Sequence, residues 1–396
     1  MQIGPHKFDR WELAGSLGDL GTLIPLMVGL IALCGLNPTS VLLIVGSAYI
    51  TAGLYYRLPI PVQPLKAMSA LAIGLELDGG TIAAGALWMG AILLILSSFN
   101  LLRFLSKLFS KPIVRGIQLS LGLILMRKAF QFMVGDGLNG ILIGLSGLAI
   151  LLLLRGNRRL PGAIAVVLFG TLTGYFLKSV HVDIDPQILS VVLPSLSQFQ
   201  VAFFLLVIPQ LPLTLGNAII ATGETAEQYF KERARRVTPC ALSRTMGLTN
   251  ILAGFFGGMP ICHGSGGLTA HHRFGARTGG ANLIIGSFFL AGAVFFTKSV
   301  LTLFFLLPLS LLGVLLFYVG VQHACLIHDL KGRTDLSLAI LIGGISILTG
   351  NLAIGFGAGI LMRTLISVFK ARRPREAFSR VPSRSRTSFI KGEIPS

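Results

Sequence analysis

Charge is scarce in this sequence of 396 residues. Only 12% of the residues are Asp, Glu, Lys or Arg, whereas about a quarter are charged in a typical soluble domain. Hydrophobic residues make up 53% of the chain, and its mean hydropathy is +0.79. This composition leaves almost nothing for a soluble domain, and it predicts an all-α, polytopic integral membrane protein.

Cysteine and nucleotide-binding motifs are equally sparse. The four cysteines lie far apart, at Cys34, Cys240, Cys262 and Cys325. They form no paired framework and are expected to be small buried hydrophobes. No G-x-x-x-x-G-K-[ST] loop occurs, which excludes ATP as the energy source. The first residues, MQIGPHKFDRWELAG, lack the pattern of a signal peptide, so no cleaved signal is expected.

Long apolar runs dominate the rest of the chain. A membrane-crossing helix needs about 20 such residues. Hydropathy predicts fourteen segments, some shorter than a full crossing, near residues 12–34, 38–56, 60–76, 80–100, 112–132, 137–154, 160–178, 199–222, 242–258, 263–275, 279–297, 300–318, 334–350 and 352–369.

The net charge of +18 has a simple topological explanation. If the N-terminus is cytoplasmic, most of the 33 Lys and Arg residues fall in cytoplasmic connections or in the C-terminal tail. This distribution follows the positive-inside rule, predicts that both termini are cytoplasmic, and requires no nucleic acid partner. The expected location is a cell inner membrane, which the topology alone does not specify. Residues 371–396 are predicted to be a disordered basic cytoplasmic tail, which anchors the topology or touches anionic lipid.

Seven segments followed by seven more give the two halves opposite orientations, as in an inverted repeat. We expect a first repeat at 1–180 and a second, inverted repeat at 198–370. Weak echoes occur at matching positions: LGD at 17–19 resembles LGN at 215–217, and the third and tenth segments both begin with a stretch broken by Pro and Gly. Interrupted segments at corresponding positions indicate a transporter's binding site near the membrane midplane.

The third segment, PIPVQPLKAMSALAIG, cannot begin as a regular helix. Pro59, Pro61 and Pro64 exclude a continuous helix, so we expect an extended piece followed by a half-helix that starts near Pro64. The N-terminus of such a half-helix favours an anion. Gln63 adds amide donors and Lys66 adds a positive charge that is costly in a membrane. The alternatives for Lys66 are snorkelling to the interface and pairing with an acid.

The tenth segment contains GGMPICHGSGG. Gly264, Gly266 and the following glycine allow backbone N–H groups to approach a ligand closely. His263 and Ser265 add side-chain donors. Two half-helix N-termini facing each other would form a compact pocket that suits a small oxyanion.

Acids within the predicted segments are few. Asp19 and Glu224 are therefore the candidates for proton coupling, although Asp19 could instead cap a broken helix. Asn217, at the position that echoes Asp19, is a candidate ligand contact. Glu12 lies near a predicted segment end and is expected to be interfacial.

Two other kinds of chemistry fit these residues poorly. The spacing of Cys262, His263, His271 and His272 does not match a zinc site, so neither a metal nor another cofactor is expected. An enzyme using Cys262 and His263 would need a positioned base that the spacing does not supply, so no catalytic residues are assigned. An anion channel shares the electrostatics of a carrier and stays open as an alternative.

Four stretches together carry a resemblance to a known family. GDLGTLIPL (18–26), PVQPLKAM (61–68), PQLPLTLGNAI (209–219) and MPICHGSGGLTAHHRFGAR (259–277) resemble the molybdate transporter family of plants and algae, with prokaryotic relatives, a branch of the sulfate permease superfamily. The last motif is the most specific of the four. The remaining segments match only by hydropathy.

The resemblance implies a secondary active transporter of molybdate, with sulfate or tungstate as alternatives, and a homodimer. It implies core and gate domains, with the substrate bound by Gln63, Lys66, Asn217, His263 and Ser265. The cytoplasmic regulatory domain common in sulfate permeases is not expected, because few residues follow the last predicted segment. Inverted-repeat relatives that carry nucleobases use an acid of the eighth segment, so Glu224 keeps a nucleobase transporter open as an alternative.

Overall fold

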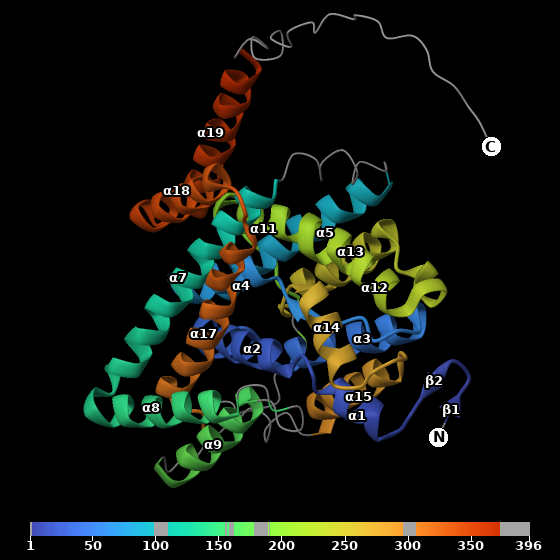
Figure 1. Ribbon diagram of the computed structural model, residues 1–396. Helices are drawn as coiled ribbons and strands as arrows, with labels where there is room; N and C mark the ends of the chain where they lie inside the picture. The colour runs from blue at the N-terminus through green and yellow to red at the C-terminus, as the bar shows by residue number, and fades with distance from the viewer. Residues whose placement is uncertain are drawn as a thin grey trace, which may run out of the picture.

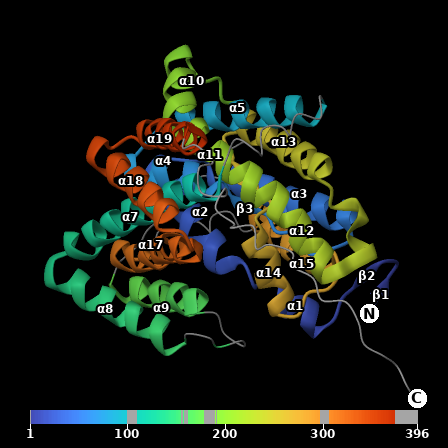
Figure 2. The same ribbon diagram turned by 45° about the horizontal axis from the view of Figure 1, so that its top comes forward.

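The computed structural model describes residues 2–98, 110–154, 157, 162–177, 189, 191–295 and 306–372. Most of the predicted tail, residues 373–396, lies outside this range. The described part is almost entirely helical, and helices occur in each of the fourteen ranges predicted from hydropathy. The chain is thus an all-α, polytopic membrane protein, and Figures 1 and 2 show its arrangement.

The helices and strands have the following bounds. In the first half they are β1 (Gln2–Ile3), β2 (His6–Lys7), α1 (Arg10–Ser16), α2 (Leu20–Cys34), α3 (Pro38–Tyr56), β3 (Gln63–Pro64), α4 (Lys66–Leu75), α5 (Gly79–Ser98), α7 (Lys111–Gly135), α8 (Gly137–Leu153) and α9 (Gly162–Leu177). In the second half they are α10 (Leu196–Ala202), η1 (Phe203–Val207), α11 (Ile208–Leu213), η2 (Thr214–Ala221), α12 (Thr222–Phe230), η3 (Lys231–Arg236), α13 (Pro239–Phe255), β4 (Ile261–Cys262), α14 (Ser265–Arg273), α15 (Gly280–Phe295), α17 (Leu309–Ala324), η4 (Cys325–Asp329), α18 (Arg333–Thr349) and α19 (Leu352–Arg372).

Not every helix is long enough to span a membrane by itself. Within the described residues, five helices are long and apolar enough, or six if α1 and α2, which meet at 40°, form one span. The five are Pro38–Tyr56, Gly79–Ser98, Lys111–Gly135, Leu196–Arg236 and Leu309–Asp329. Several others, including α4, α8, α9 and α15, are shorter apolar helices.

The eighth predicted segment departs from a regular helix. It contains two π-helical stretches, η1 and η2, on either side of α11. Pro209 and Pro212 lie in α11 and have no N–H to donate, so nearby carbonyls lose their usual partners. A π-helical turn accommodates such a loss and is frequent at functional sites.

The helices form two groups, each drawn from both halves of the sequence. In one group α7 packs against α17 and α18, α8 against α17 and α9, and α18 against α19. In the other, α3 packs against α15, α5 against α13 and α10, and α12 against α14. Figure 1 shows the first group on the left and most of the second on the right. The short helix α4 contacts α7 of the first group and α5 of the second, whereas α2 packs against α9 and α17, and α11 against α7 and α19.

Candidate functional site

The two broken segments meet in an antiparallel ladder. Gln63 of β3 pairs with Cys262 of β4, and Pro64 pairs with Ile261. The amide of Leu65 also donates to the carbonyl of Pro260 at 3.0 Å. Each strand leads directly into a half-helix, α4 or α14. Because the strands are antiparallel, the two helix N-termini approach the ladder from opposite sides.

Side chains from neighbouring helices hold the ladder in place. The Asn250 side chain on α13 donates to the carbonyl of Ile261 at 2.9 Å and accepts from its amide at 2.8 Å. The Asn282 side chain on α15 donates to the carbonyl of Ile60 at 2.6 Å. Both asparagines are fully buried. Extended backbone at membrane depth requires such internal partners, since lipid offers none.

The two helix N-termini differ in their free donors. At α4 the amides of Ala67 and Met68 donate to Oε1 of Gln210, at 2.8 and 3.1 Å. This N-terminus is therefore largely capped by α11. At α14, no described residue accepts a hydrogen bond from the amides of Ser265 and Gly266. A methyl group built on Gly266 would meet no atom within 4 Å, so this face of α14 borders open space.

Polar side chains converge on the start of α14. The Gln63 side chain donates from Nε2 to Oδ1 of Asp19 at 2.7 Å. Ser265 Oγ donates to Oδ1 of Asn217 at 2.7 Å, which leaves the amide donors of Asn217 without a described partner. Gly264 and Gly267 pack so closely on this cluster that a Cβ on either would lie within 3 Å of the Gln63 side chain. The structure thus brings together predicted residues from the first, third, eighth and tenth segments.

Two buried acceptors in this cluster have no hydrogen-bond partner among the described residues. They are Oδ2 of Asp19 and Oε1 of Gln63. A buried acceptor without a partner is costly, so these two oxygens call for a partner such as a proton, a water molecule or a ligand.

His263 is not a free hydrogen-bond donor, because both of its ring nitrogens have partners within the protein. Its Nδ1 lies 2.7 Å from the carbonyl oxygen of Pro61, and its Nε2 lies 2.9 Å from Oγ1 of Thr245. Thr245 Oγ1 is in turn 2.8 Å from the hydroxyl of Tyr56. Both ring nitrogens are occupied, so His263 connects the two broken segments to α13 and α3.

Lys66 is the first residue of α4 and is partly buried. Its positive charge is close enough to interact electrostatically with Asp19, Cys262 and His323. Among the described residues it forms no salt bridge. The alternative in which Lys66 pairs with an acid is thus not seen.

The structure also places three further residues considered in the sequence analysis, and it contradicts the expectation for one of them, Glu12. Glu224 is exposed on α12 and has no described hydrogen bond or ion pair with the cluster around Asp19. The Cys262 thiol donates to the carbonyl of Pro64 at 3.4 Å. Glu12 was expected at the interface, which is wrong: it is 1% exposed.

Glu12 instead joins α1 to the start of α15. Its Oε1 accepts from the amides of Arg277 and Thr278 and from the Thr278 hydroxyl, at 2.8 to 3.0 Å. Its Oε2 accepts from the amide of Ala281 at 3.2 Å. The carboxylate satisfies the free N–H groups at a helix start, which makes its burial tolerable.

Sequence reasoning missed Gln210, Thr245 and Asn250 as residues that build the site. Gln210 had the clearest signal, because it is a polar residue between two prolines within a predicted membrane segment. Thr245 and Asn250 had no such signal, since single polar residues on one face of a membrane helix are common.

The sequence is similar to a known family of transporters and to individual members of it. Residues 11–125 and 202–322 match the family described as "Molybdate transporter of MFS superfamily". Molybdate transporter 2 of Arabidopsis thaliana is 28% identical over 407 residues, covering 90% of this chain and 87% of that protein. Molybdate transporter 1 of Chlamydomonas reinhardtii is 24% identical, with 91% and 92% covered.

Solved structures share the fold at low sequence identity. The transmembrane domain of the cyanobacterial bicarbonate transporter BicA matches with a TM-score of 0.66 at 15% identity, covering 89% of this chain and 98% of that chain. The anion transporter SLC26A9 matches with a TM-score of 0.70 at 16% identity, covering 92% of this chain and 66% of that chain.

Proposed function

This chain belongs to the molybdate transporter family, and we propose that it carries molybdate across a membrane as a secondary active transporter. The curated relatives are transporters, which confirms that the chain is a transporter and not an enzyme. The substrate is proposed because the named relatives are molybdate transporters and because the residues around α14 suit a tetrahedral oxyanion. The excess of basic residues in predicted inward connections favours cytoplasmic termini, and a cell inner membrane is the proposed location.

The proposed oxyanion site is the N-terminus of α14. The observation that carries this proposal is the open face at Gly266, where the amides of Ser265 and Gly266 have no described partner. We assign direct contact with the anion to these amides, to the Ser265 hydroxyl, to the Asn217 amide and to the Lys66 ammonium. Donors at a helix N-terminus and a nearby cation favour a doubly charged anion.

The remaining site residues are assigned a supporting role. Gln63 orients Asp19, Gly264 allows the Gln63 side chain to approach α14, and His263 fixes the Pro61 carbonyl. These contacts hold the two broken segments at a fixed separation. A site preorganised in this way loses less free energy when it binds its ligand.

We also propose that the fold is the inverted repeat expected from the sequence, with residues 1–180 and 198–370 as its halves. The packing pairs support this reading. Exchanging each segment with its counterpart seven segments away converts the pair α3–α15 into α13–α5, the pair α8–α9 into α18–α19, and the pair α7–α18 into α17–α8. All six pairs pack against each other.

The two helix groups would then be the moving parts of the carrier. The group containing α3, α5, α13, α14 and α15 carries the ladder, and we assign it the role of the core. The group containing α7, α8, α9, α17, α18 and α19 is assigned the role of the gate. Movement of one group against the other would expose the site alternately to the two sides of the membrane.

Asp19 is the proposed coupling acid. It is buried, next to the proposed site, and one of its oxygens has no described partner. Glu224 lacks these features because it is exposed. Protonation of Asp19 would lower the negative charge beside an arriving dianion, so binding of a proton and of the anion would favour each other.

Reconstitution in proteoliposomes tests the proposed function. Molybdate uptake should saturate, should show counterflow with internal molybdate, and should release the anion chemically unchanged. Uptake that does not saturate would instead indicate a channel. Uptake of uracil or sulfate in preference to molybdate would mean that the fold is right and the proposed substrate is wrong.

A further inference from the structure

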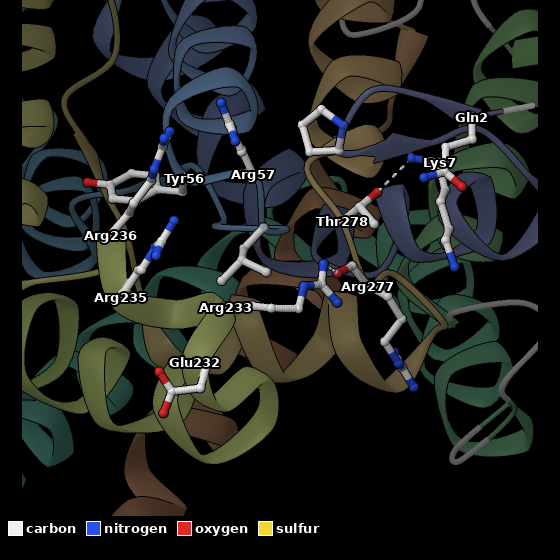
Figure 3. Close-up of a pocket in the computed structure, with 12 residues that line it drawn as sticks. Gln2, Lys7, Tyr56, Arg57, Glu232, Arg233, Arg235, Arg236, Arg277 and Thr278 are labelled. Atoms are coloured by element: carbon white, nitrogen blue, oxygen red, sulfur yellow. Dashed lines mark hydrogen bonds between the residues drawn. The ribbon is translucent and has the colours of Figure 1, made fainter.

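A cavity lined by basic residues lies away from the ladder. Its volume is about 430 Å³, and its walls come from the N-terminal hairpin, the end of α3, η3 and the connection between α14 and α15. Six basic residues line it, as Figure 3 shows: Lys7, Arg57, Arg233, Arg235, Arg236 and Arg277. The positive-inside pattern of the sequence predicts that all six face the cytoplasm.

The positive charge of this basic pocket is uncompensated. Glu232 is the one acidic residue in its lining. Among the described residues, none of the six basic side chains forms a salt bridge. Arg233 and Arg236 donate to the backbone carbonyls of Arg277 and Tyr55, which carry no net charge. Like charges gathered around one cavity repel, so a bound anion would stabilise the arrangement.

Two basic residues at or next to the pocket, Arg57 and Lys231, have strained backbone conformations. Arg57 ends α3 with φ of 58°, in a left-handed conformation that glycine or asparagine usually adopts at this position. Lys231, with φ of 50°, turns the chain into η3, which carries three of the pocket's arginines. Strained non-glycine residues persist where the surrounding structure enforces them, and they cluster at ligand sites.

The pocket wall formed by the N-terminal hairpin is firmly attached. The Lys7 amide donates to Oγ1 of Thr278 at 3.1 Å, and Thr278 is itself held by Glu12. Beside it, the pKa of His6 is lowered by burial and by the positive charge of Arg57. The hairpin side of the pocket is therefore held in place, and the positive charge of the pocket acts on the neighbouring His6.

The dimensions of the pocket indicate the ligand class. A volume of about 430 Å³ is within the range of small-molecule sites, roughly 300–1,000 Å³. It is far more than one tetrahedral oxyanion needs. Arginine binds phosphate oxygens through paired hydrogen bonds, so five arginines and a lysine suit several phosphate groups at once. We propose that the basic pocket binds a multiply phosphorylated anion from the cytoplasmic side, either a soluble polyphosphate or the headgroup of an anionic lipid.

A hydrogen-bond chain connects the pocket to the ladder. Tyr56 lines the pocket, and its hydroxyl lies 2.8 Å from Oγ1 of Thr245. Thr245 contacts Nε2 of His263, and Nδ1 of His263 contacts the carbonyl of Pro61. A ligand that fixes the end of α3 therefore acts on the broken third segment. This part of the inference rests on the proposed function, and it predicts that polyphosphate changes the affinity for molybdate.

Calorimetric titration with inorganic tripolyphosphate tests the binding site without any molybdate. The full chain, in nanodiscs of neutral lipid, is compared with Arg235→Gln, with Arg57→Gln/Arg235→Gln and with the control Lys331→Gln/Arg333→Gln. The control removes two exposed positive charges, predicted to be cytoplasmic, that are outside the pocket. Arg235 has no described hydrogen bond, so its replacement should leave thermal unfolding unchanged.

The pocket variants should bind tripolyphosphate at least about tenfold more weakly, because charge-assisted hydrogen bonds are lost, while the control binds normally. If the natural ligand is a lipid headgroup, the wild type but not the double pocket variant should retain cardiolipin from mixed nanodiscs, and tripolyphosphate should displace it. The proposal is overturned if the wild type binds neither ligand, or if the control loses as much affinity as the pocket variants.

A second titration, with molybdate in the presence and absence of tripolyphosphate, tests the connection to the ladder. The molybdate affinity of the wild type should shift, and the shift should disappear in Tyr56→Phe, which keeps the ring and loses the hydroxyl. An unchanged affinity in the wild type would overturn the connection. Failure of the proposed function is distinguishable, because molybdate would then not bind under either condition.

Discussion

Gln63 lies opposite Cys262 in an antiparallel ladder, although half of the sequence separates them. Each of the two residues comes shortly before a half-helix, so the ladder fixes where both helices begin. Gln63 also reaches Asp19 of the first segment. A single backbone pairing thus brings three distant segments to one place, and the predictions below test what that place does.

Gly266 allows a test that separates binding from folding. In Gly266→Ala the new methyl group enters open space, so folding should be preserved. The methyl group would occupy the proposed oxyanion position, and molybdate should bind at least about tenfold more weakly. Gly344→Ala, which also adds a methyl in open space, is the control and should bind normally. Normal binding by Gly266→Ala would place the anion elsewhere.

Asp19→Asn separates coupling from binding. The Asn carbonyl can still accept the hydrogen bond from Gln63, whereas the side chain can no longer take up a proton. The variant should bind molybdate within a few-fold of the wild type but fail to accumulate it in proteoliposomes under a pH gradient. Equal accumulation by the variant and the wild type would rule out Asp19 as the coupling acid.

Glu12→Gln should destabilise the fold. The neutral amide accepts weaker hydrogen bonds than a carboxylate and places an NH₂ group near the amide donors of Thr278 or Ala281. We expect a loss of about 2–3 kcal/mol in the free energy of unfolding, measured by denaturation in detergent. Glu227→Gln, at an exposed position, is the control. A loss no greater than that of the control would mean that the buried carboxylate contributes little.

Glu76, at the end of α4, forms a salt bridge with Lys128 of α7, a helix of the proposed gate. The hydrogen bond and the charge of Lys128 lower the pKa of Glu76. The pair's contribution is therefore complete above the ordinary glutamate pKa, about 4.3, and is lost as the pH falls through the lower value in the folded protein.

Glu76→Gln should thus cost about 0.5–1 kcal/mol at pH 7, because the Glu76 side chain is 60% exposed to solvent, although that of Lys128 is only 11% exposed. Thermal unfolding at pH 7 and pH 5 should give the same difference between variant and wild type. A difference that shrinks already between these two values would contradict the lowered pKa.

Local sequence signals predicted the positions of the helices. Pro38 and Tyr56 are the predicted and observed limits of one helix, because Pro at a helix start and an apolar run of suitable length are local features. The extended start of the third segment followed from its prolines in the same way. The π-helical stretches around Pro209 and Pro212 were not predicted, because the same prolines are compatible with a kinked α-helix.

The partners of the site residues could not be predicted from local patterns. The pattern around His263 marks a polar position at a break, but it does not show that Thr245 and the Pro61 carbonyl occupy both ring nitrogens. Likewise, the acidic residue at position 12 lies near a segment end in sequence, yet the connection after α14 folds over it. Such contacts depend on packing between segments that are distant in the chain.

The most direct test of the account is a calorimetric titration of molybdate into the purified wild type and Lys66→Gln, with sulfate, tungstate and uracil as comparison ligands. The account predicts that the wild type binds molybdate and does not bind uracil. It also predicts that Lys66→Gln, folded normally by thermal unfolding, binds molybdate at least about tenfold more weakly because a full positive charge is lost from the site. Equal molybdate affinity in the two proteins would contradict an oxyanion site between the half-helices α4 and α14.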